Sequence, residues 1–233
     1  MCSRFTLNLG DAINLGQRLG IPLGASTPVA TRYNIAPSTR VTTFRSAHAA
    51  TVHWGLIPHW AQPDRAPSAP LINARSETVA DKPSFRTAWK KGQRCLIPTS
   101  GFYEWEKDGR ARLPWLFTRA DGAPLVFAGL WDRWQDPTDQ TVIESCTVLT
   151  TTANPLLGRI HDRMPVILDE TDAQTWLDPA LGAAAAADLM RPFDAQRMQE
   201  TALDLYVNSS RHEGPACLTP RGQSPGAQLG FDL

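Results

Sequence analysis

The sequence lacks a long hydrophobic run. None of its apolar stretches approaches the roughly 18 residues that a membrane-spanning helix needs. A secretory signal needs an uninterrupted apolar core, whereas the first twenty residues are broken by the charges of Arg4, Asp11 and Arg18. We therefore predict a soluble, cytoplasmic protein without a membrane partner.

Cysteine is scarce and scattered. The four cysteines form no CxxC pair and lie far apart, at Cys2, Cys95, Cys146 and Cys217. This spacing signals neither a zinc site nor a disulfide framework, so a reducing compartment is the simpler expectation. Four of the five histidines also lack partners at metal-ligand spacing, namely His48, His53, His59 and His212. The sequence implies no metal and no cofactor.

The chain has no net charge, since 23 Lys and Arg residues balance 23 Asp and Glu residues. This excludes binding of polyanions through overall charge. The balance conceals an asymmetry, because residues 1–120 hold 16 basic and 7 acidic residues, whereas residues 121–233 hold 7 and 16. Only 4 of the basic residues are lysine, and the planar guanidinium of arginine suits phosphate binding and base stacking. The alternative is that an arginine-rich, alanine-rich chain merely reflects genomic base composition.

Short runs rich in Val, Thr, Phe and Trp, bounded by Gly, Pro or Asp, dominate the chain and predict β-strands. They lie at residues 4–7, 41–44, 51–57, 94–97, 102–106, 115–118, 125–130 and 142–150. Capping residues and helix-ending Gly or Pro predict few, short helices, at 11–19, 84–91, 172–177 and 183–187. No βαβ alternation is evident. The fold class is therefore α+β, mainly antiparallel β with a few short peripheral helices.

Two segments are poor in periodicity. Residues 61–70 form a Pro-rich loop, and the chain from Gly214 onward is rich in Gly and Pro. Neither separates two foldable halves, because predicted strands continue across every candidate boundary and no repeat is visible. We predict one domain, residues 1–213, followed by a tail, residues 214–233.

The N-terminus carries a candidate nucleophile. Cysteine is small enough for the initiator methionine to be removed before it, which would leave a free α-amine beside a thiol on Cys2. Such groups have unperturbed pKa values of about 8 and about 8.5, so both are nucleophilic near neutral pH. This aminothiol could condense with an aldehyde to an imine that the thiol closes into a thiazolidine. The thiol could instead attack an amide or ester, or position 2 could be an accident of a frayed terminus.

Further islands of polar and aromatic residues end or interrupt the predicted strands. They read YNIAP at residues 33–37, WGLIPHW at 54–60, INARSE at 72–77, GFYEW at 101–105 and IHDRMP at 160–165. With MCSR at residues 1–4, these motifs resemble the SRAP family of SOS-response-associated peptidases, also called abasic-site processing proteins. The resemblance extends from Cys2 through the IHDRMP motif and toward Val207 and Asn208, so it covers nearly the whole chain except the tail.

The resemblance implies a barrel-like sheet and a protein that shields abasic sites in single-stranded DNA during the response to DNA damage. Such a protein links its N-terminal cysteine covalently to the ring-opened sugar, which is the reaction that the aminothiol chemistry also suggests. It implies Cys2 as the crosslinking residue, with Asn73, Glu104 and His161 as site residues. It also implies a peptidase-like step that exposes Cys2. One departure is Ser3, where the family usually has glycine, which affects how closely DNA could approach.

Two of these residues suit proton transfer. Strand alternation places Glu104 on the same face as Phe102, and an apolar surrounding raises the pKa of a carboxyl group. His161 lies beside Asp162 and Arg163, which could fix its tautomer near neutral pH. Asn73 could donate to a sugar hydroxyl or a phosphate. Alone, each residue has a structural alternative: a solvent-facing glutamate, a structural histidine and a turn-capping asparagine.

Single-stranded DNA is held by cationic grooves combined with aromatic platforms. We expect Arg4, Arg75 and Arg163 to contact phosphates, and we expect bases to stack on Pro37, Trp54 and Trp60. Weaker groove candidates are Arg86 and Arg94.

The sequence thus predicts a monomeric protein that acts on abasic single-stranded DNA, associated with the nucleoid at damaged sites. Two other functions stay open. One is an N-terminal-nucleophile peptidase or amidase that uses Cys2 with His161 as base. The other is a non-catalytic single-strand-binding module.

Overall fold

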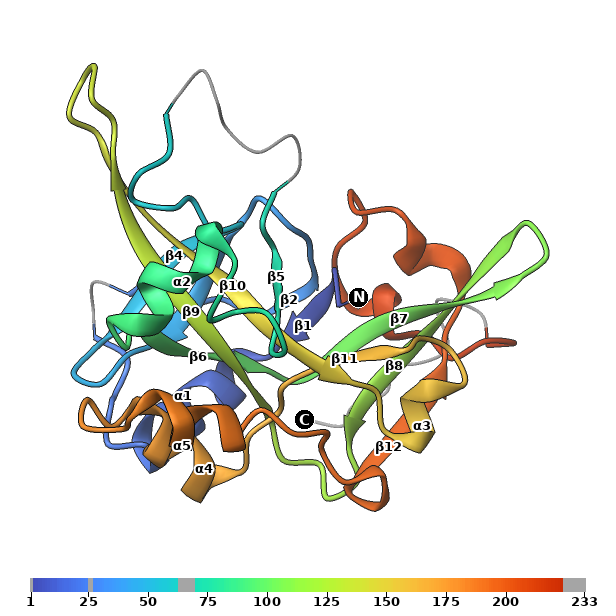
Figure 1. The fold of residues 1–233 in the computed structure, drawn as a ribbon. Helices are drawn as coiled ribbons and strands as arrows, with labels where there is room; N and C mark the ends of the chain where they lie inside the picture. Colours follow the sequence, from blue (N-terminus) through green and yellow to red (C-terminus); the bar gives the residue numbers. More distant parts are fainter. Residues whose placement is uncertain (1, 25–26, 63–69, 224–233) are drawn as a thin grey trace.

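The strands form two curled β-sheets (Figure 1). The computed structural model describes residues 2–24, 27–62 and 70–223. One sheet is antiparallel throughout, in the order β12 (Met198–Ala202), β8 (Ala111–Arg119), β7 (Gly101–Asp108), β1 (Phe5–Leu7) and β2 (Arg32–Ile35). The other sheet runs in the order β11 (Arg163–Pro165), β10 (Val142–Thr152), β4 (Ala49–Trp54), β3 (Arg40–Phe44), β6 (Arg94–Thr99) and β9 (Leu125–Gln135).

The second sheet curls until its ends meet, because β9 also pairs with β10. The strands of this sheet thus form a closed ring, but β3 and β6 are joined by a single residue pair, Phe44 with Leu96. It is therefore curled rather than a fully bonded barrel. Two pairings are parallel: β10 with β4, and β10 with the short β5 (Asn73–Arg75). The predicted class, mainly antiparallel β with few helices, is confirmed.

Short helices cover the outside of the second sheet (Figure 1). They are α1 (Leu9–Arg18), α2 (Pro83–Lys90), α4 (Glu170–Leu177) and α5 (Ala183–Asp188). Each lies within two residues of its predicted range. The Asn8 side chain caps α1 by accepting from the Gly10 N–H at 2.8 Å, as residues at this position commonly do. None of the helices in the described residues is long and apolar enough to cross a membrane.

Smaller helical turns support the first sheet and were not predicted. They are α3 (Pro155–Gly158) and the 3-10 helices η2 (Ala195–Arg197), η3 (Leu205–Asn208) and η4 (Pro215–Leu218). Cys217 and Thr219 are buried and Pro220 forms a β-bridge with Leu203, so residues 215–220 of the predicted tail pack on the domain. Residues 224–233 of that tail, and residues 63–69 of the Pro-rich loop, lie outside the described residues.

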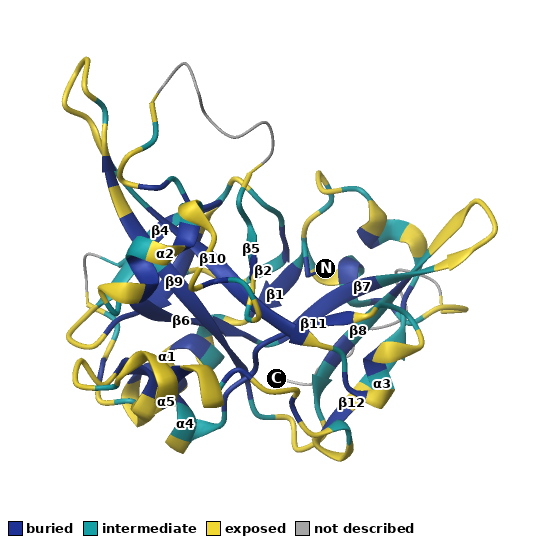
Figure 2. Cartoon of the chain, in the orientation of Figure 1, coloured by how far each residue is buried: buried dark blue, intermediate teal, exposed yellow. Residues whose placement is uncertain are grey.

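One apolar core joins the two sheets (Figure 2 shows the strands buried along most of their length). Phe5 of the first sheet contacts Trp54 of the second edge to face, with ring centroids 5.2 Å apart. Phe102 meets Phe127 in the same way at 5.7 Å. Because the next residue of β7, Tyr103, packs in a separate cluster on the opposite face, the predicted alternation along this strand is confirmed.

Two sequence predictions need correction here. Trp54 is completely buried and its indole N–H donates to the Ile72 carbonyl, so it presents no face on which a base could stack. Its strand ends at residue 54 rather than 57, because the chain turns at Gly55 with φ of 138°. Arg94 is also buried, and its guanidinium donates to the carbonyls of Trp176 and Asp178, where it caps α4 rather than facing a groove.

Candidate functional site

A hydrogen bond between Asn73 and Cys2 joins two of the predicted site residues. The short strand β5 places Asn73 beside the N-terminal segment, and its Nδ2 donates to the Cys2 carbonyl at 2.8 Å. The Asn73 Oδ1 atom is buried and has no hydrogen-bond partner among the described residues. The amide thus fixes the backbone of Cys2 and keeps one acceptor for a further donor.

The Cys2 side chain is completely buried in the core between the sheets. Burial raises the pKa of this thiol far above its ordinary value, and the negative charge of Glu104 raises it further. The thiol is therefore protonated at neutral pH in the chain that still carries Met1. Cys95, Cys146 and Cys217 are also free and buried.

Glu104 occupies β7, on the face that it shares with the core residue Phe102. It is only 3% exposed, and this burial raises its pKa to about 7, although the positive charge of Arg112 acts in the opposite direction. A carboxyl group with this pKa is about half protonated at neutral pH, so it can both donate and accept a proton. The elevated pKa that the sequence suggested is confirmed.

His161 lies between α3 and β11, and its tautomer follows from the backbone. The Arg163 N–H donates to its Nδ1 at 3.0 Å, so Nδ1 is the acceptor and the proton of the neutral ring is on Nε2. Asp162 lies 2.9 Å from the same Nδ1, a contact that becomes an ion pair only when the ring is protonated. Burial lowers the pKa of His161, so the ring is neutral at pH 7 with Nε2–H as a donor.

A pocket of about 580 Å³ brings Glu104 and His161 together with Ser3, the residue after Cys2. Positively charged side chains also line it, which sequence reasoning missed: Lys107, Arg112 and Arg159. Arg159 is ion-paired with Glu200 and stacks on Trp115, with its guanidinium carbon 4.3 Å from the ring centroid. Among the described residues, no cluster of His, Cys, Asp or Glu could hold a metal ion.

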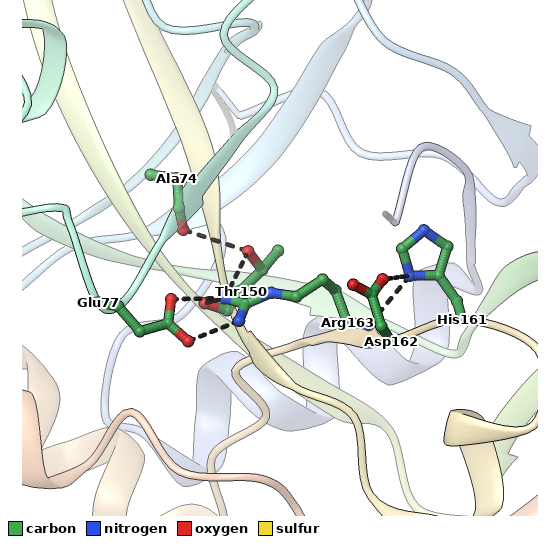
Figure 3. Close-up of polar contacts among 6 residues, drawn as sticks. All are labelled: Ala74, Glu77, Thr150, His161, Asp162 and Arg163. Atoms are coloured by element: carbon green, nitrogen blue, oxygen red, sulfur yellow. Dashed lines mark hydrogen bonds and ion pairs between the residues drawn. The ribbon is translucent and has the colours of Figure 1, made fainter.

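Arg163 ties the strand of Asn73 to the segment of His161. Its guanidinium donates to both carboxylate oxygens of Glu77, at 2.5 and 2.9 Å, and to the Thr150 carbonyl (Figure 3). Figure 3 also shows the His161 ring pointing away from this ion pair. Arg163 is 8% exposed. In contrast to the prediction, it has no free face for a phosphate in this structure.

Arg4 is likewise engaged within the protein. It donates to Asn34 Oδ1 at 2.7 Å and to the Val207 carbonyl at 3.3 Å, and it lies 5.3 Å from the Trp105 ring centroid. These contacts anchor the chain two residues after Cys2. Arg4 is half-buried, and phosphate binding by Arg4 stays a prediction.

The other predicted DNA contacts differ in exposure. Arg75 is exposed, Trp60 is 51% exposed and Pro37 is half-buried. Arg75 follows Asn73 by two residues on β5, which places its charge at the edge of the site. Phosphate binding by Arg75 and stacking by Pro37 and Trp60 stay predictions.

Comparison with known proteins gives a family and close structural relatives. A family model described as SOS response associated peptidase (SRAP) matches residues 1–210. The abasic site processing protein YoqW of Bacillus subtilis is 35% identical, over 92% of this chain and 97% of its own length. The abasic site processing protein YoaM of the same organism is 33% identical, over 94% and 97%. A crystal structure of a protein from Bacteroides thetaiotaomicron has a TM-score of 0.85 and 27% identity, over 94% of this chain and 99% of its own.

Proposed function

This chain belongs to the SOS response associated peptidase (SRAP) family, and on that premise we propose that it processes abasic sites in single-stranded DNA by a covalent bond to Cys2. The observation that carries the proposal is the grouping around Cys2: Asn73 holds its carbonyl, and the pocket beside it contains Glu104 with a pKa of about 7. We further propose that the protein acts as a monomer at damaged DNA in the nucleoid.

The first requirement is removal of Met1. In the unprocessed chain the nitrogen of Cys2 is part of a peptide bond, and an amide nitrogen does not form an imine. The Asn73 hydrogen bond fixes the residue whose nitrogen is the leaving group of this peptidase step. Because Cys2 is completely buried in the unprocessed chain, the proposal also requires that its amine become accessible after processing.

The second step opens the abasic sugar, which is a cyclic hemiacetal. Protonated Glu104 gives a proton to the ring oxygen as the bond between this oxygen and C1′ breaks, and the proton of the C1′ hydroxyl is lost to a base. The product is an aldehyde and a free C4′ hydroxyl, so no atoms are gained or lost. A carboxyl group with a pKa near neutral pH suits this exchange, since it regains its proton readily.

The third step forms the crosslink. The α-amine attacks C1′ and the resulting carbinolamine loses water, for which the Nε2–H of neutral His161 and the Glu104 carboxyl are available donors. The thiol then adds to the imine: a carbon–sulfur bond forms, and the sulfur proton passes to nitrogen. Aldehyde and aminothiol thus give a thiazolidine and one water. Nitrogen reacts first, because the thiazolidine ring closes only when the thiol adds to an imine that the amine has already formed.

The experiment mixes the protein with a single-stranded oligonucleotide that carries one abasic site, and separates the products on a denaturing gel. A slower band that survives heat and detergent reports a covalent bond. Cys2→Ala keeps an α-amine, so we expect it to lose the stable band and to give one only when borohydride traps the imine. Intact-mass measurement of the same samples should show that the reactive protein lacks Met1.

The matched control is the same oligonucleotide without the abasic site, which should give no band. If wild-type protein gives no band and instead hydrolyses a peptide or amide through Cys2, the amidase function is correct. If it binds the strand without reacting at all, the protein is a plain binding module.

A further inference from the structure

The hairpin of β7 and β8 places two positive charges directly opposite each other. Lys107 and Arg112 are paired residues in the antiparallel register of these strands, and both are exposed. Like charges at directly opposed positions of a strand pair destabilise it. Within the described residues neither side chain has an ion pair with a carboxylate. The repulsion between the two charges is only partly offset by Arg112, whose guanidinium carbon lies 5.9 Å from the Trp105 ring centroid, and an anion between the two charges would relieve it.

These two charges are part of the site and not a remote surface. Both residues line the pocket that contains Glu104 and His161, and strand alternation places Lys107 on the face of Trp105, opposite Glu104. Arg112 acts against the burial that raises the pKa of Glu104, and Lys107 adds to the burial that lowers the pKa of His161. Three acidic residues also line the pocket. Glu104 is buried, Glu106 accepts from the Trp115 indole N–H, and Asp162 forms an ion pair with His161 only when that ring is protonated.

The position of the pair relative to Cys2 suggests what it binds. The described N-terminal end of the chain lies between β5 and the β7–β8 hairpin (Figure 1), in agreement with the Asn73 hydrogen bond on one side and the pocket with Ser3 on the other. The strand β5, which ends at Arg75, and the β7–β8 hairpin, which carries Lys107 and Arg112, therefore lie on either side of the N-terminal segment. A strand whose abasic sugar reaches Cys2 would extend past both.

We propose that Lys107 and Arg112 together form a phosphate-binding subsite for the DNA backbone on the side of the abasic nucleotide away from Arg75. The inference rests on the proposed function and adds a second backbone contact to it. An exposed pair of cations is suited to this, because single-stranded DNA binding is driven largely by release of counterions from phosphates.

The test measures the affinity for an undamaged single-stranded oligonucleotide between 50 and 200 mM salt, for wild-type protein, Lys107→Gln, Arg112→Gln and the double variant. Each phosphate contact that is lost should reduce the slope of log affinity against log salt by about 0.7, which is about fivefold in affinity at 0.1 M salt. Removing one of two opposed charges should leave the Tm unchanged or raise it. Weaker binding together with unchanged or higher stability separates a binding role from a structural one.

Arg110→Gln is the matched control. Arg110 is exposed at the turn of the same hairpin but does not line the pocket, so this variant loses the same charge and should bind like wild type. Equal affinities and slopes for all variants would overturn the subsite while wild-type crosslinking still supports the proposed function. If Arg110→Gln loses as much DNA affinity as the pocket variants, the effect comes from net charge alone, and this result would also overturn the subsite. Wild-type protein that neither binds nor crosslinks DNA would overturn both proposals.

Discussion

Burial of Glu104 makes the folded protein less stable whenever this carboxyl group is ionised. Its pKa is about 7 in the folded state against 4.5 for the ordinary group, so the folded state holds an extra proton between these values. Stability therefore falls as the pH rises through this window, by an upper limit of about 3 kcal/mol. We expect Glu104→Gln to raise the Tm at pH 8 and to change it little at pH 4, because an amide does not ionise. Since it also cannot transfer a proton, we expect it to slow crosslinking roughly 100- to 10,000-fold. Thermal unfolding at both pH values and single-turnover crosslinking at saturating DNA measure these effects.

Asp108→Asn, at the exposed end of the same strand and outside the pocket lining, is the control that should change neither quantity. A stability difference for Glu104→Gln that does not depend on pH would contradict the assigned burial effect. An unchanged crosslinking rate would leave Glu104 a structural residue.

At the residue scale, the sequence indicates residues whose reactive groups can be recognised from their immediate neighbours in the chain. Cys2 and Glu104 could be singled out because an N-terminal aminothiol and a carboxyl group in an aromatic strand are local patterns, whereas Asn73 was indicated only by the family resemblance. The role of Arg163 could not, because its partner Glu77 is 86 residues away in the chain. An arginine that binds phosphate and an arginine that closes an internal ion pair look identical until the fold brings the carboxylate to it.

At the scale of elements, one buried amide connects β2 to the segment after η3. The Nδ2 of Asn34 lies within hydrogen-bond distance of the carbonyls of Ser209 and His212, each at 2.9 Å, while its Oδ1 accepts from Arg4. Asn34→Ala leaves these buried groups without partners, so we expect a loss of roughly 2 to 4 kcal/mol in the free energy of unfolding. Hydrogen exchange should rise first in residues 205–213, before the rest of the sheet.

Asn34→Asp refines this test, because a carboxylate keeps the Arg4 contact and loses the donor to the two carbonyls. It should therefore also release residues 205–213 while keeping the segment around Arg4 protected. Unchanged exchange in residues 205–213 of both variants would show that other contacts hold this segment.

Long strands could be predicted from the sequence, whereas short strands that form only by pairing with a neighbouring strand could not. Long strands such as β9 and β10 carry enough Val, Thr and Trp to be recognised, although β9 continues beyond its predicted end at residue 130 to residue 135. The three-residue strands β5 and β11 exist because β10 offers them a pairing edge. Their residues have no local pattern that predicts a strand, so the elements that place Asn73 and Arg163 were missed.

At the scale of the whole molecule, the ring of strands requires both halves of the chain. β9 and β10, from the acidic half, complete the ring begun by β3, β4 and β6 in the basic half. Ion pairs also cross between the halves, including Arg45 with Glu144. We therefore expect a single cooperative unfolding transition, with equal calorimetric and van't Hoff enthalpies in scanning calorimetry. Two resolved transitions, or a folded fragment of residues 1–120, would contradict the single-domain prediction.

All four cysteines are buried, so the folded chain shields its thiols from reagents in solution. The proposed crosslink would use each molecule once, so its reactive group must not be consumed by other electrophiles beforehand. Peroxides, disulfides and alkylating agents react with accessible thiolates, and the folded, unprocessed chain presents none. We therefore expect the four thiols of the folded, unprocessed chain to resist oxidation and alkylation, which would keep Cys2 available for the proposed reaction.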